Sequence, residues 1–195
     1  MSSCAWAVGP FLKKYHDEEW GVPVHDEIKH YEFLVLEAMS CGLSWELMLK
    51  KREVFRSVFA DFDFRQVAKF TDADVERIMG VEGMIRSPRK IRAMIHNAQC
   101  FMAIAEEFGS FDRYIWGFTK GKTLVYHRHQ EEGDWETHNE LSDALAKDMK
   151  KRGFKYLGSV ILYSHLQAIG IINADLPPLS RIAESNKCRV PISIN

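Results

Sequence analysis

The chain has 195 residues, of which 46% are hydrophobic and 12% aromatic, and its formal net charge is −1. This length and apolar content are sufficient for one domain, or for two closely packed halves, with a substantial core. No apolar run approaches the roughly 18 residues of a membrane span, and no basic segment followed by an apolar one indicates a signal peptide.

The four cysteines show neither a CxxC pair nor a dense framework, which is typical of free thiols in a reducing cytoplasm. We therefore predict a cytoplasmic protein with no membrane partner. No long exposed apolar face is evident, so a monomer is expected. The net charge argues only weakly against nucleic acid as a partner, because phosphate contacts need only a local basic patch.

The first half of the chain predicts a series of helices. Apolar residues are dense enough over 26–41 for a buried helix, and Ser44 can cap the N-terminus of the next one. Asp63 and Thr71 each begin a pattern that resembles a capping box, which predicts two further short helices.

Helical signals continue in the second half. Ser87 followed by Pro88 predicts a helix start, and an apolar stripe then runs over about five turns to Gly109. A helix is expected over 141–152, where cations and then a glycine end it, and a last, mostly buried helix over 156–170. No run of alternating strands competes, so the prediction is an all-α fold.

Two segments lack this periodicity. The polar, His-rich stretch 119–139 predicts a long surface connection, and after Pro177 the pattern is typical of a loose tail. We therefore predict one domain over 1–176 and a C-terminal tail over 177–195.

An aromatic and acidic cluster stands out near the N-terminus. Tyr15, Trp20 and Trp45 are large rings, and Glu37 is a carboxylate in an apolar run. Rings can stack on a flat or cationic ligand, while a carboxylate accepts its N–H groups or offsets its charge. The alternative is structural, since tryptophans are usually core residues and Glu37 could pair with an arginine or a backbone N–H.

Residues 75–92 predict a short helix, a tight glycine-containing turn and a new capped helix. Four cations lie at the start of the second helix, namely Arg86, Arg89, Lys90 and Arg92. Cations are unfavourable at a helix N-terminus, whereas its N–H groups suit a phosphate. The pattern therefore favours contact with DNA, although a solvated helix start is the simpler alternative.

With these segments in hand, the chain resembles 3-methyladenine DNA glycosylase I, a family of the helix-hairpin-helix glycosylase superfamily. The resemblance runs from Cys4 to about Asn173. The matching blocks are Cys4 to Trp6, Tyr15 to Pro23, Cys41 to Trp45, Lys50 to Glu53, Lys151 to Lys155, and Tyr163 to Ala168.

The resemblance implies a fold of two helical lobes with the active site between them. It also implies excision of N3-methyladenine from double-stranded DNA, with free 3-methyladenine as product, an abasic site and no lyase step. By resemblance, Glu37 recognises the adenine edge, Tyr15 and Trp45 sandwich the base, Trp20, Trp6 and Ser164 complete the pocket, Leu43 is the wedge, and the hairpin residues Gly83, Arg86, Arg89 and Lys90 bind DNA.

The family also carries a structural zinc ion, and here the match fails. Cys4 and His16 correspond to two zinc ligands, but Asp175 and Leu179 stand where the other two are expected. Asp175 and Cys188 could still complete a site, although an unusual one. We therefore expect no metal and no required cofactor.

Two other functions remain open from the sequence. A catalytically silent module could recognise damaged DNA without cutting it, which the presence of Glu37, Tyr15 and Trp45 disfavours. A small-molecule protein could instead bind a free purine, which the hairpin cations disfavour. A salt-sensitive affinity for DNA distinguishes the two, because phosphate contacts release counterions.

Overall fold

The computed structural model describes residues 6–125 and 136–173. Within these ranges the chain is mostly helical, which confirms the predicted all-α class. The helices are α1 (Pro10–Glu18), α2 (Glu27–Ser40), α3 (Trp45–Val58), α4 (Phe64–Val67), α5 (Asp72–Met79), α6 (Pro88–Phe108), α7 (Phe111–Gly117), α8 (Glu140–Lys151) and α9 (Ser159–Ala168), with a 3₁₀ turn, η1, at Ala60–Phe62. None of these helices is long and apolar enough to cross a bilayer.

The predicted capping residues begin their helices. The Ser44 and Ser87 hydroxyls accept hydrogen bonds from the backbone N–H groups of Leu47 and Lys90. Thr71 forms a capping box with Asp74, and α6 ends at a left-handed glycine, Gly109. Each cap satisfies backbone groups that the helix end leaves unpaired, so these starts are legible in the sequence.

Two parts of the fold differ from the prediction. The last helix begins at Ser159 rather than at 156, because Tyr156 has a positive φ of 59° that interrupts a helix. A two-residue parallel strand pair also joins β1 (Leu124–Val125) to β2 (Ile172–Asn173). Strands this short show no alternation that a sequence could reveal. The predicted tail over 177–195 lies outside the described residues.

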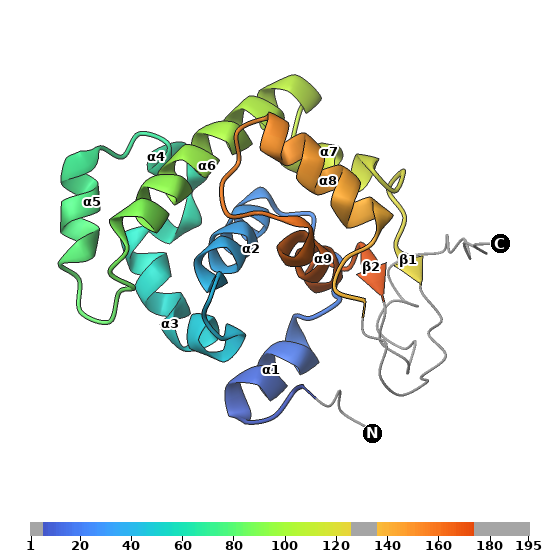
Figure 1. Cartoon of the computed structure of the whole chain (residues 1–195), viewed down its shortest axis with the longest axis horizontal. Helices are drawn as coiled ribbons and strands as arrows, with labels where there is room; N and C mark the ends of the chain where they lie inside the picture. Colours follow the sequence, from blue (N-terminus) through green and yellow to red (C-terminus); the bar gives the residue numbers. More distant parts are fainter. Residues whose placement is uncertain (1–5, 126–135, 174–195) are drawn as a thin grey trace.

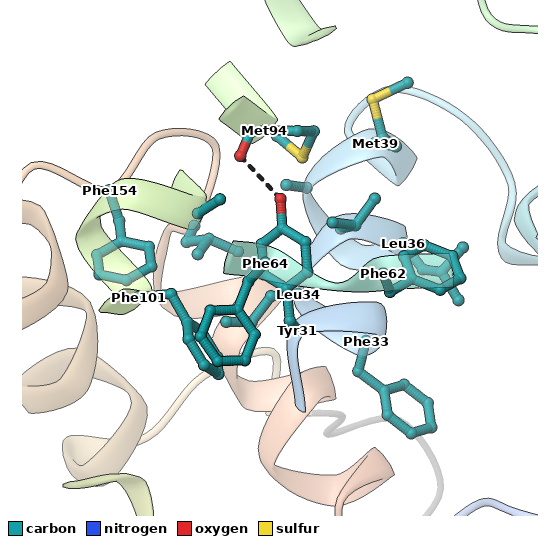
Figure 2. Close-up of a cluster of buried hydrophobic side chains, with 14 of the residues drawn as sticks. Tyr31, Phe33, Leu34, Leu36, Met39, Phe62, Phe64, Met94, Phe101 and Phe154 are labelled. Atoms are coloured by element: carbon teal, nitrogen blue, oxygen red, sulfur yellow. Dashed lines mark hydrogen bonds between the residues drawn. The ribbon is translucent and has the colours of Figure 1, made fainter. Parts of the chain in front are cut away.

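Helix α2 runs through the middle of the molecule. In Figure 1, α3, α4 and α5 lie on one side of it, and α7, α8 and the strand pair lie on the other. Every residue of α2 from His30 to Ser40 is buried. In Figure 2, Tyr31 points into the aromatic core, where its hydroxyl donates a hydrogen bond of 2.9 Å to the Met94 carbonyl. A helix buried on all sides carries whatever polar residue it contains into the interior, and here it carries Glu37.

Candidate active site

Glu37 lies in the last turns of α2 with a side chain only 4% exposed. Within the described residues its carboxyl makes no hydrogen bond or ion pair, so the predicted structural alternative, a pairing partner, is not seen. Burial raises the pKa of Glu37 to about 8. A buried carboxyl without a partner costs free energy, and such groups gather at functional sites.

Aromatic rings cluster around Tyr15, whose hydroxyl is close enough to Glu37 to be affected by its charge. The Tyr15 ring centroid lies 5.5 Å from that of Trp45 and 5.9 Å from that of Trp20, and Trp6 lies 5.1 Å from Trp20. Burial raises the pKa of the Tyr15 hydroxyl, and the nearby charge of Glu37 raises it further. The structure therefore brings together the four predicted aromatic residues and the predicted acid, although their roles toward a base stay predictions.

Two further polar atoms in this cluster lack partners. The Tyr15 hydroxyl and the Trp45 Nε1–H are buried, and neither forms a hydrogen bond with any described residue. Each buried polar atom left unpaired costs about 1–3 kcal/mol. With the Glu37 carboxyl, they form a set of unused hydrogen-bonding groups between rings, which a flat polar ligand would complete.

The turn between α2 and α3 lies beside this cluster. Gly42 adopts a positive φ of 78°, the Leu43 N–H donates to the Ser40 carbonyl, and α3 then begins at Trp45. This tight turn leaves the Leu43 side chain 40% exposed, unusual for a leucine next to a buried helix. An exposed apolar tip beside an aromatic pocket is the position that a wedge requires.

A charged network that the sequence analysis did not predict fastens α1 to α2 and α3. Arg52 donates through both terminal nitrogens to Glu19, at 2.6 and 2.8 Å, and through Nε to Glu32 at 2.8 Å. Lys29 and Arg56 add bonds to the same two carboxylates. Glu19 directly precedes Trp20, and both backbone N–H groups donate to the Tyr15 carbonyl. The network therefore holds the wall of the aromatic cluster in place.

Replacing Arg52 with alanine is expected to lower the free energy of unfolding by about 2 kcal/mol. Removing one partner of a buried ion pair costs about 3–5 kcal/mol, and the retained Lys29 and Arg56 and the partial exposure of Glu19 reduce this. Urea unfolding measures the change. The matched control is Arg77→Ala, which removes an exposed pair with Asp74 and should cost less than about 1 kcal/mol. Equal effects of the two substitutions would contradict this assignment.

The predicted hairpin is present, with α5, a turn at Gly80–Ser87 and α6. Gly83 is exposed with a φ of 80°, and its carbonyl accepts a hydrogen bond from Lys51 Nζ. Arg86 is exposed and has no partner within the described residues. Its phosphate contact stays a prediction, and the open geometry is compatible with it.

Lys90 and Arg89 are oriented by the protein itself. Lys90 Nζ donates to the carbonyls of Met39 and Cys41, at 2.9 and 2.6 Å, and so caps the C-terminal end of α2. Arg89 Nε donates to the Tyr156 hydroxyl at 2.6 Å. The Lys90 ammonium thus has a structural role that the sequence analysis did not foresee, beside its predicted contact with DNA.

The positions of the other predicted residues do not test their predicted roles. Ser164 is half-buried on α9, and the structure shows no hydrogen bond from its side chain to another described residue. His16 Nδ1 lies 3.0 Å from an Asp17 oxygen. Cys4, Asp175, Leu179 and Cys188 lie outside the described residues, so the zinc question stays a prediction.

Comparison with known proteins identifies the family of this chain. The family model described as methyladenine glycosylase matches residues 6–178. DNA-3-methyladenine glycosylase 1 of Escherichia coli (strain K12) is 40% identical over 89% of this chain and 92% of its own length. DNA-3-methyladenine glycosylase of Haemophilus influenzae is 37% identical over 83% of this chain and 87% of its own length.

Solved structures share the fold. A crystal structure of 3-methyladenine DNA glycosylase I covers 88% of this chain and 94% of its own, with 40% identity and a TM-score of 0.83. The Staphylococcus aureus structure described as the structural basis of 3-methyladenine recognition covers 89% and 92%, with 33% identity and a TM-score of 0.83. This chain belongs to the methyladenine glycosylase family.

Proposed function

We propose that this protein is a DNA-3-methyladenine glycosylase that excises N3-methyladenine by hydrolysing its N-glycosidic bond. The observation that carries this proposal is the buried, unpaired Glu37 carboxyl beside the rings of Tyr15 and Trp45. The relatives named DNA-3-methyladenine glycosylase, at 37–40% identity over most of the chain, support it.

The charge on the substrate explains how such a pocket can be selective. N3-methylation places a positive charge on adenine, which the aromatic faces attract and the Glu37 carboxylate can offset. With a pKa of about 8, Glu37 is mostly protonated at neutral pH until a cation enters and stabilises its ionised form. Unmethylated adenine carries no such charge, so it does not offset the free-energy cost of ionising a buried acid.

The same charge reduces the catalytic demand. The base must leave the helical stack at a cost of a few kcal/mol, which stacking in the pocket and the Leu43 wedge offset. When the glycosidic bond breaks, its electron pair moves to the base, which leaves as neutral 3-methyladenine. Water adds to the sugar carbon and loses a proton, and an abasic site remains.

A further lyase step is not part of the proposal. Such a step needs an amine nucleophile, and the hairpin lysine, Lys90, has its ammonium bonded to the Met39 and Cys41 carbonyls. These two bonds hold the Lys90 ammonium against the end of α2, so this lysine is not free to attack the sugar. We therefore propose a monofunctional enzyme with water as the acceptor.

The test is release of free bases from methylated genomic DNA by the purified protein, resolved by chromatography, with a chelator-treated sample alongside. Selective release of 3-methyladenine in both samples is expected and would also show that metal is dispensable. No release by a folded protein that binds DNA would instead support the catalytically silent module.

A further inference from the structure

A groove of about 450 Å³ lies between the start of α6 and the segment that joins α8 to α9. Its lining residues are Arg89, Arg92, Ala93, His96, Lys155 and Tyr156. Three of these side chains carry a full positive charge and none is a carboxylate, although the chain as a whole has a net charge of −1. The groove is therefore a local concentration of positive charge that fits an anionic ligand.

A second groove of similar size is lined by side chains of both charges. It has a similar volume, about 460 Å³, and lies over the Arg52 network. Cations and carboxylates in this second groove pair closely with one another, as Arg52 does with Glu19 and Glu32. Its charges are therefore used within the protein, whereas no carboxylate lines the groove beside α6.

The arginine side chains in the α6 groove are positioned by other residues but keep unused hydrogen-bond donors. The Tyr156 hydroxyl binds Arg89 through Nε alone, so both terminal nitrogens of that guanidinium donate to no described residue. Arg92 Nε pairs with Asp72 at 2.8 Å, but the two side chains are 56% and 78% exposed, and an exposed pair contributes little. A fork-shaped guanidinium with unused N–H groups matches a phosphate.

The groove also adjoins the base pocket. Cys41 Sγ donates to the Tyr156 carbonyl at 3.5 Å, and Cys41 lies two residues before the Leu43 wedge. Residues 89–96 advance about 10 Å along α6, so the groove continues the basic surface of the hairpin along this helix.

We propose that this groove binds the phosphodiester backbone of DNA next to the flipped nucleotide, and so extends the phosphate contacts from the hairpin along α6 to Lys155. This inference rests on the proposed function, because it takes DNA as the substrate. It adds Lys155, which lies 65 residues beyond Lys90 in the sequence, to the surface that binds DNA.

The test is Lys155→Glu, with Arg92→Ala as a second variant that keeps the groove's shape at Lys155. The matched control is Lys147→Glu, an exposed lysine on α8, which lies across the molecule from α5 in Figure 1. Fluorescence anisotropy would follow binding to a short duplex with an abasic-site analogue from about 50 to about 200 mM NaCl. Thermal unfolding would confirm that each variant is folded.

Each groove variant is expected to bind about tenfold more weakly at low salt, and its slope of log affinity against log salt should decrease by about 1. Unchanged affinity and slope, or an equal loss in Lys147→Glu, would overturn the inference. Base release by the wild-type protein keeps the two proposals apart. If it releases base while Lys155→Glu binds normally, only the groove assignment fails. If it binds DNA through the groove but releases no base, only the glycosylase proposal fails.

Discussion

Replacing Glu37 with glutamine is expected to lower the rate of 3-methyladenine excision by about 10²–10³-fold and to leave the fold intact. This is the loss typical of removing one preorganised electrostatic group from a buried site. Glutamine has nearly the same shape and still accepts a hydrogen bond, but it cannot carry the negative charge that offsets a cationic base. Single-turnover excision from methylated DNA measures the effect.

The control for this variant is Glu106→Gln, which changes an exposed glutamate on α6 in the same way. It should excise the base at the wild-type rate. Wild-type excision by Glu37→Gln would show that the Glu37 carboxylate is not needed for excision.

The same substitution should change how stability depends on pH. Folding raises the pKa of Glu37 from its ordinary value near 4.5 to about 8. The folded state therefore binds this proton more tightly than the unfolded state between those pH values. The resulting stabilisation is complete below about pH 4.5 and is lost as the pH rises to 8.

Glutamine at position 37 does not titrate, so it avoids this loss. Between about pH 6 and 8.5 the wild-type protein is expected to lose on the order of 2 kcal/mol more than the variant, since one pKa unit corresponds to about 1.4 kcal/mol. Urea unfolding at the two pH values measures the difference. Parallel pH profiles for the two proteins would show that Glu37 is not buried as a free acid.

Much of the fold could be predicted because its signals are local. Ser44, Thr71 and Ser87 each cap a helix whose first residues follow immediately, so a few adjacent residues contain the information. Glu37 was also visible, because a carboxylate in the apolar run of α2 demands an explanation whatever surrounds it.

Contacts between distant segments were not visible. Arg52 meets Glu19 and Glu32 only once α1, α2 and α3 pack together, and any of them could have been a solvated surface charge. Lys90 belonged by sequence to the hairpin cations, yet its ammonium reaches the end of α2, 49 residues earlier at Cys41. Charge type can be read from a sequence, but the partner of a charge depends on packing.

Replacing Trp45 with alanine is expected to weaken binding of free 3-methyladenine by about 10- to 100-fold. The free base is neutral, so stacking on the ring, which contributes about 1–3 kcal/mol, is the interaction that this truncation removes. Trp45 begins α3 and is only partly buried, so its truncation should leave the helix and its Ser44 cap in place. Calorimetric titration with 3-methyladenine measures the affinity, and circular dichroism checks the fold.

Trp45→Phe separates the two properties of this side chain. Phenylalanine keeps a stacking face but removes the buried Nε1–H, which has no partner within the described residues. If the ring alone acts, Trp45→Phe should bind within about threefold of wild type. A larger loss would mean that Nε1–H donates to the base, because a donor left unpaired in the free protein costs about 1–3 kcal/mol that a ligand can recover. Wild-type affinity in Trp45→Ala would instead place the base away from this ring, and the arrangement of Tyr15, Glu37 and Trp45 as one pocket would be wrong.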